Sequence, residues 1–184
     1  MSRGPGAWTA LITTFFWISA ALAQGAPTTH AGTKLNFPPT LGGATFVASF
    51  NHGNALSYRY MAGKIQLTVQ IFDGGRRVPA GSGNPTVVNE FSAEMAEAEV
   101  QARAGGLTGF EKPAVPSSCG FSAITFRCSV YSAASGNGRI YGKLLMTGYR
   151  DSFVKVMAEW SQADNVTLAD ADKALAAFVP ALMQ

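Results

Sequence analysis

The chain has 184 residues, of which 47% are hydrophobic and 14% charged, and its formal net charge is +3. This composition is typical of a globular domain and excludes an intrinsically disordered chain. The near balance of 14 basic and 11 acidic side chains also argues against a nucleic-acid-binding protein, for which a clustered basic stripe is expected.

Residues 1–23 have the pattern of a secretory signal peptide. Arg3 is the only charge, and an apolar run over residues 7–20 leads into Ala21-Leu22-Ala23, the small-x-small pattern that signal peptidase cleaves. The run is shorter than the ~20 residues that cross a bilayer comfortably as a helix, which favours cleavage over a retained anchor. We therefore expect cleavage after Ala23 and a soluble product, periplasmic or secreted, with no stable membrane span.

The first half of the remaining chain is predicted to form strands and then a helix. Residues 24–34 have no hydrophobic periodicity and indicate a flexible N-terminal arm, followed by one globular domain over residues 35–184. Alternating apolar and polar residues predict strands at 44–50, 56–60 and 64–72. A polar loop rich in glycine and proline runs from Asp73 to Gly83 and is a candidate partner-contacting loop. Asn84 and Pro85 then begin a helix of about 20 residues.

The second half repeats this order with different residues. Alternation predicts strands at 124–130, 139–149 and 154–160. Thr167 and Asp170 form a capping-box pattern before a helical apolar stripe, which Pro180 is expected to end or kink. The predicted fold is α+β: an antiparallel sheet of about six strands in the order β-β-β-α-β-β-β-α, with two main helices packed on it.

Cys119 and Cys128 are the only cysteines, and an oxidising compartment favours a disulfide between them. If residues 119–128 formed one extended strand, the two ends would lie ~30 Å apart. A disulfide requires Cα atoms separated by ~4.4–6.8 Å. The predicted bridge therefore requires the chain to reverse, and residues 119–123 are the most suitable place.

The sequence contains no recognisable catalytic, cofactor-binding or metal-binding constellation. Two histidines, His30 and His52, are too few for most zinc sites, so no metal or cofactor is predicted. His52 with Asp73 and a serine hydroxyl would make an exported hydrolase, but no serine lies in a G-x-S-x-G motif and an exposed turn histidine is favoured. Glutamates 90, 94 and 97 are interpreted as the solvated face of the first helix.

Aromatic and basic residues on the predicted strands and the loop form a candidate interaction surface. Amphipathic aromatic side chains next to arginines suit ligand or protein surfaces, although each of them also stabilises sheets through cross-strand contacts. The candidate residues are Tyr58, Arg59, Tyr60, Arg76, Arg77, Arg139 and Tyr141.

Three segments, Leu56 to Tyr60, Ile65 to Phe72 and Tyr149 to Trp160, resemble the Mog1p/PsbP-like group of exported α+β proteins in strand order and hydrophobic pattern. The resemblance carries no specific motif and transfers no functional residue. It implies an accessory or binding protein rather than an enzyme.

The favoured hypothesis is an exported, noncatalytic accessory or binding module, monomeric, with a protein or small-molecule partner and no nucleic acid. One alternative is the hydrolase built on His52 with an acidic residue. The other is a carrier of a small apolar ligand in a cavity lined by Phe91, Met95 and Leu175.

Overall fold

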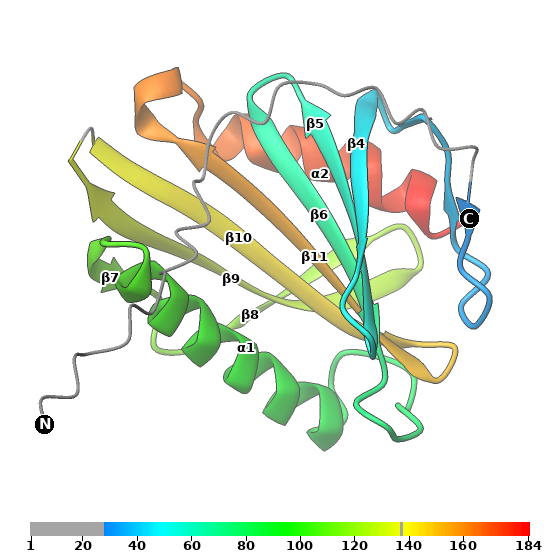
Figure 1. The fold of residues 1–184 in the computed structure, drawn as a ribbon. Helices are drawn as coiled ribbons and strands as arrows, with labels where there is room; N and C mark the ends of the chain where they lie inside the picture. Colours follow the sequence, from blue (N-terminus) through cyan, green and yellow to red (C-terminus); the bar gives the residue numbers. More distant parts are fainter. Residues whose placement is uncertain (1–27, 137) are drawn as a thin grey trace, which may run out of the picture.

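The computed structural model describes residues 28–136 and 138–184 (Figure 1). Nine strands form one antiparallel sheet in the order β3-β4-β5-β6-β11-β10-β9-β7, with β8 also paired to β9. Strands β1 and β2 form a separate two-stranded sheet. The elements are β1 (Thr28–Thr29), β2 (Asn36–Phe37), β3 (Thr40–Leu41), β4 (Ala44–Asn51), β5 (Ala55–Ala62), β6 (Ile65–Phe72), α1 (Pro85–Ala104), β7 (Thr108–Glu111), β8 (Ser117–Phe121), β9 (Ile124–Ser135), β10 (Gly138–Tyr149), β11 (Ser152–Ser161), the 3-10 helix η1 (Gln162–Asp164) and α2 (Leu168–Leu182).

The predicted α+β class, with an antiparallel sheet and two main helices, is confirmed. The predicted number of six strands and the order β-β-β-α-β-β-β-α are wrong. Strand β3 precedes the first predicted strand, and β7 and β8 lie between α1 and β9. These three strands have only two to five residues each, too few for an alternating pattern to identify them.

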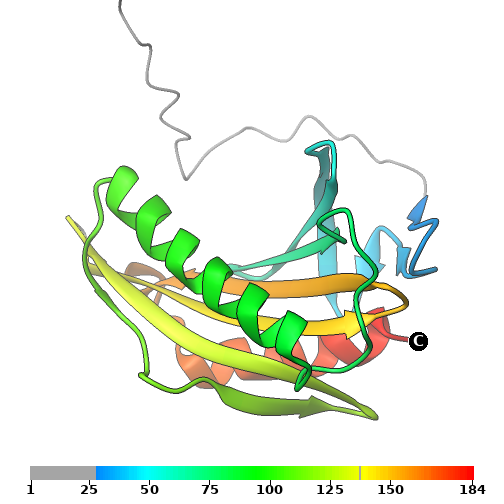
Figure 2. The same ribbon diagram turned by 90° about the horizontal axis from the view of Figure 1, so that it is seen from below.

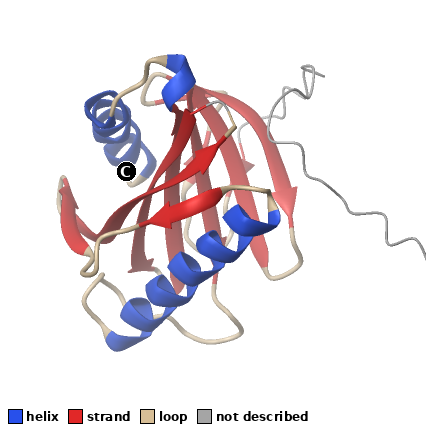
Figure 3. Cartoon of the chain, turned by 90° about the vertical axis from the view of Figure 1, so that its left-hand side faces the viewer, coloured by secondary structure: helices blue, strands red, loops and turns tan. Residues whose placement is uncertain are grey.

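The two helices cover opposite faces of the sheet, as Figure 2 shows. We call these the α1 side and the α2 side. Helix α2 packs against β11, β3 and β8, whereas α1 packs against β10, β9 and β7. The sheet curls so that β4 and β5 rise on the α1 side, and α1 lies across the other half of that face (Figures 2 and 3). Among the described elements, β5 and β6 are therefore less covered on the α1 side than the strands beneath α1.

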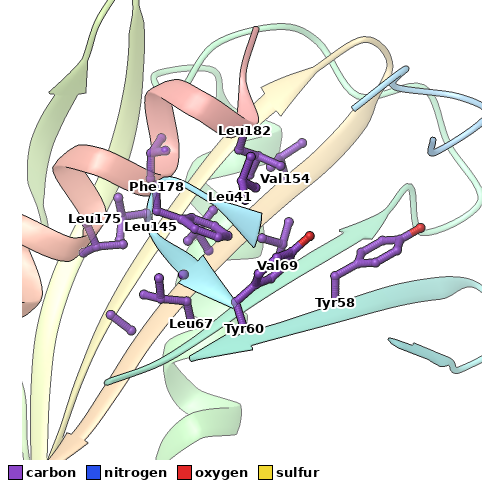
Figure 4. Packing of buried hydrophobic residues seen from close by; sticks show 14 of the residues in the cluster. Leu41, Tyr58, Tyr60, Leu67, Val69, Leu145, Val154, Leu175, Phe178 and Leu182 are labelled. Atoms are coloured by element: carbon purple, nitrogen blue, oxygen red, sulfur yellow. The ribbon is translucent and has the colours of Figure 1, made fainter. Parts of the chain in front are cut away.

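The larger hydrophobic cluster fills the α2 side (Figure 4). Leu175, Phe178 and Leu182 of α2 are almost completely buried against the strands. The Phe178 ring meets the Tyr60 ring edge-on, with ring centroids 5.2 Å apart. The predicted inward set of β6 faces this cluster and is buried: Ile65, Leu67, Val69 and Ile71. The cluster thus accounts for the clearest alternation in the sequence.

Local sequence signals place both helices. The Asn84 side chain accepts a hydrogen bond from the Val87 backbone N–H at the start of α1, 2.9 Å away. Thr167 and Asp170 form the expected capping box at the start of α2. The helix continues past Pro180 to Leu182, so this proline, expected to end or kink the helix, does not end it. The proline lies in the last turn, where Met183 N–H still bonds to Val179 C=O.

Cys119 and Cys128 form the predicted disulfide, with Cα atoms 6.1 Å apart. Strands β8 and β9 pair as a hairpin, in which Phe121 lies opposite Ile124. The chain therefore reverses between the two cysteines, at the end of residues 119–123, the segment predicted to turn. The bridge ties β8 to the edge of the long strand β9.

The predicted signal peptide, residues 1–23, lies outside the described residues. Of the expected flexible arm, residues 28–34 are described: they form β1 and a turn in which Thr33 is buried. Strand β1 pairs with β2, and His30 N–H donates to Leu35 C=O. Neither helix of the described part has the length and apolar character needed to span a membrane.

Candidate functional site

Polar side chains gather on the α1 side of the central strands. Alternation along β6 places Gln66, Thr68 and Gln70 on this face, all half-buried. Along β11 the same alternation places Lys155 and Glu159 there, opposite the apolar residues that face α2. The face toward α2 is therefore apolar over residues 65–71 and 154–160, while the other face carries a buried polar network.

One row of this network crosses four strands. In the register of the sheet, Tyr131 of β9 lies opposite Gly142 of β10, Gly142 opposite Glu159 of β11, and Glu159 opposite Gln66 of β6. The Tyr131 hydroxyl donates to Glu159 Oε1 at 3.1 Å, and Gln66 Nε2 donates to Oε2 at 3.3 Å. Because Gly142 has no side chain, the tyrosine ring can lie across β10 and reach the carboxylate. A Cβ atom at Gly142 would overlap that ring.

Burial dominates the electrostatics of this row. It raises the pKa of the Glu159 carboxyl, and the bond from Tyr131, the charge of Arg59, the bond from Gln66 and the charge of Lys155 oppose that rise. Burial, with the adjacent Glu159 charge and hydrogen bond, also raises the pKa of Tyr131 well above its ordinary value. Perturbed carboxyl and phenol groups in contact make this row a candidate functional site.

Lys155 connects the sheet to helix α1. Its ammonium donates to Glu94 Oε2 at 2.6 Å, and its side chain is only 9% exposed. Glu94, interpreted from the sequence as part of a solvated stripe, is instead half-buried in this ion pair. A cavity of about 50 Å³ lies beside the pair and Tyr131. That volume suits ordered water rather than a metabolite.

Arg59 of β5 lies on the less covered half of the α1 side. Its guanidinium carbon stands 5.0 Å from the centre of the Phe50 ring, and its Nε atom is buried. Within residues 28–136 and 138–184, the guanidinium forms no ion pair and Nε has no hydrogen-bond partner. Buried polar atoms without partners are rare in proteins, and among the described residues Arg127 Nε and Thr147 Oγ1 share this state.

The seven residues of the predicted interaction surface do not form one surface. Tyr58 and Tyr60 are buried on the α2 side, and Tyr141 stacks on Trp160 there. Arg59 lies on the opposite face of the sheet, over Phe50.

The other three arginines of that set are ion-paired elsewhere. Arg76 pairs with Glu90, Arg77 with Asp151 and Arg139 with Glu111. The hydrogen bond and charge of Asp151 raise the pKa of Arg77. Of the seven predicted residues, Arg59 alone has a charge that none of the described ion pairs neutralises.

Among the described residues, the groups of the alternative hydrolase hypothesis, His52 with Asp73 and a serine, are not hydrogen-bonded to one another. His52 is exposed, and its ring lies 6.3 Å from that of Phe50. Asp73 instead accepts the Gly75 N–H at 2.7 Å, closing its own turn. In the described part of the chain, no hydrogen bond connects His52 with Asp73 or with a serine.

A second hollow, of about 160 Å³, lies near this turn and is lined in part by His30, Asp73 and Ser152. The Nδ1 atom of His30 accepts the Thr33 N–H at 3.0 Å, and burial lowers the pKa of the imidazole. The histidine thus orders the turn over residues 30–33.

The three residues named for the apolar carrier alternative do not line one cavity within the described residues. Phe91 and Met95 belong to the cluster beneath α1, whereas Leu175 belongs to the cluster beneath α2, so the sheet separates them. Among the described residues, no group of three or more His, Cys, Asp or Glu side chains is placed to hold a metal ion.

Sequence reasoning identified Arg59 but missed Tyr131, Lys155, Glu159 and Gln66 as one site. The signal available was the alternation in β11, where a lysine and a glutamate occupy the positions between buried apolar residues. Their partners depend on the order of the strands, which periodicity does not provide.

No protein-family model matches the chain, and no curated protein matches it either. The resemblance to the Mog1p/PsbP-like group stays a prediction.

Proposed function

We propose that this protein is an exported, noncatalytic accessory or binding module that contacts its partner on the α1 side of β5, around Arg59. The observation that carries this proposal is the guanidinium itself. It is half-buried and positively charged, and its Nε atom has no partner within the described residues. A partner that supplies an anionic acceptor would pair with the guanidinium charge, which none of the described ion pairs neutralises.

The surroundings of Arg59 support binding. Thr68 and Gln70 project from the neighbouring strand on the same face, and Phe50 is 40% exposed beside the guanidinium. Exposed aromatic and arginine side chains on a rigid sheet are the usual anchors of protein interfaces. The buried Tyr131–Glu159 row lies on the same face, and the Arg59 charge acts on the Glu159 carboxyl.

The test is copurification from the exported fraction. The tagged full-length protein would be produced in its native host, isolated gently and analysed by native and denaturing mass spectrometry, which also reads the N-terminus. We expect a stoichiometric partner with the wild type and with Arg77→Met, an exposed arginine control, and its loss with Arg59→Met.

The competing enzyme hypothesis predicts a different result. The same preparations would be assayed on fluorogenic ester and amide substrates. Turnover that His52→Ala abolishes, together with a bare wild-type monomer, would overturn the binding proposal.

A further inference from the structure

Within the part of the chain that the structure describes, no strand pairs with the second half of the outer edge of β4. Strand β3 pairs only with Ala44 and Thr45, and the Phe46 N–H donates to Pro39 C=O. On the inner edge, His52 N–H bonds to Ala55 C=O at the hairpin. Because bonding alternates along an antiparallel pair, Ala48 and Phe50 bond inward to β5, while the backbone groups of Ser49 and Asn51 point outward. No described strand pairs with them.

This edge lacks charge protection. Natural edge strands are commonly guarded by lysine, other charges or proline. Here residues 35–58 contain no Asp, Glu, Lys or Arg. Val47 and Phe50 are 44% and 40% exposed at the edge. A bulge between Phe46 and Ala48 limits the free edge to a short segment. The edge is therefore a template for one short added strand.

Arg59 lies on β5, the strand that pairs with the inner edge of β4. It is the cross-strand neighbour of Ala48, and both Arg59 and Phe50 face the α1 side. A strand added outside β4 would stand two strand spacings, roughly 9.6 Å, from β5. Because Ala48 carries only a methyl group, a long acidic side chain on the added strand and the arginine can meet above it.

We propose that β4 accepts an extended peptide segment of a partner protein as an added strand, and that a carboxylate on that segment pairs with Arg59. This inference rests on the proposed binding function and names the chemistry of its partner. Backbone bonds to Ser49 and Asn51 supply the docking, and the carboxylate supplies the specificity. A second copy of β4 is a poorer occupant because its edge has no acidic residue to offer Arg59.

The probes are two synthetic peptides, acetyl-TVTETVT-amide and the variant with Gln in place of Glu. They would be titrated into the isotope-labelled processed protein, with amide chemical shifts recorded by NMR. We expect the amide shift changes to be concentrated in β4 and β5. The Glu peptide should bind with a Kd about tenfold lower than the Gln peptide, because one charge-assisted hydrogen bond changes Kd by about that factor. Arg59→Met should reduce the Glu peptide to the affinity of the Gln peptide.

The edge itself is tested with a matched pair of variants. Ser49→Pro removes one outward N–H, and an edge position whose N–H faces outward tolerates proline. Ser49→Ala keeps that N–H. We expect Ser49→Pro to abolish peptide binding and Ser49→Ala to preserve it. Equal binding of both peptides, an unchanged affinity of Ser49→Pro, or shifts that avoid β4 would each overturn the proposal.

Two outcomes separate this inference from the proposed function. If the native partner is lost with Arg59→Met but retained with Ser49→Pro, the binding function stands and strand addition fails. If sedimentation shows a wild-type dimer that Ser49→Pro dissociates, the occupant is a second copy and the peptide proposal is overturned. Retention of the native partner with Arg59→Met contradicts both.

Discussion

A single methyl group added at Gly142 tests the packing of the buried row that contains Tyr131 and Glu159. The Cβ of Gly142→Ala would lie 2.6 Å from Tyr131 Cε1 and closer still to the end of the ring. The ring must therefore move off β10. It would lose its bond to Glu159, worth about 1.5–3 kcal/mol for a charged acceptor, and disturb its stack on Phe110, worth about 0.5–1.5 kcal/mol.

Part of this loss is offset, because glycine within a strand destabilises the folded protein by about 0.5–1 kcal/mol relative to alanine. The expected net loss is about 1–4 kcal/mol in the free energy of unfolding, measured by urea denaturation. Gly120→Ala is the matched control, since a Cβ at this strand glycine meets nothing within 4 Å. We expect that variant to be neutral or slightly stabilised.

A double-mutant cycle identifies the cause. In a Tyr131→Ala background the added methyl has room, so Gly142→Ala should cost almost nothing there. If Gly142→Ala costs the same in both backgrounds, the clash with Tyr131 is not what limits this position, and the account of the row is refuted.

Three further changes test the fold and its electrostatics. Val69→Asp places a carboxylate at a fully buried site and should cost about 4 kcal/mol or more in urea unfolding; a negligible change would contradict the assigned strand face. Because the folded pKa of Glu159 is raised, the native state holds more protons than the unfolded state between the ordinary and raised pKa, so stability falls as pH rises through that window. Glu159→Gln should reduce this fall and the exposed control Glu97→Gln should not, as read from urea unfolding at several pH values. Replacing Cys119 and Cys128 by serine should cost about 2.5 kcal/mol for a loop of this length, and nonreducing mass analysis of the wild type should show one intramolecular bridge.

The sequence predicted the long elements well because their signals are local. Alternation over eight residues identified β6, and the Asn84-Pro85 start placed α1. Strands β3 and β7 were not predicted because they have two and four residues, too few for an alternating pattern. A segment of that length forms a strand only where a neighbouring strand pairs with it. Their existence depends on the sheet edge offered by β4 and β9.

The site was less predictable than the fold because it depends on register. Tyr131 and Glu159 are 28 residues apart, and only the alignment of β9, β10 and β11 brings them opposite Gly142. The predicted tyrosine and arginine surface failed to assemble for the same reason. Tyr58 and Arg59 are neighbours in sequence, and adjacent residues of a strand point to opposite faces.

The buried row and the proposed strand site are coupled through charge. Arg59 lowers the pKa of Glu159, against the rise caused by burial. A partner carboxylate that neutralises Arg59 removes this influence, so binding should raise the pKa of Glu159 further. The other groups that act on this carboxyl are Tyr131 from β9 and Lys155 from β11, the latter held by Glu94 of α1. By linkage, a complex that takes up a proton forms more tightly as pH falls.

This coupling gives the Glu peptide a pH-dependent affinity. We expect its Kd to decrease as pH is lowered toward the raised pKa of Glu159, as long as the peptide carboxylate itself stays ionised. Glu159→Gln should flatten that dependence while still binding the peptide, because it removes the titrating group but leaves Arg59 in place. The Gln peptide provides the control, since it does not neutralise the guanidinium. An affinity that changes equally with pH in the wild type and in Glu159→Gln would mean that the row and the edge act independently.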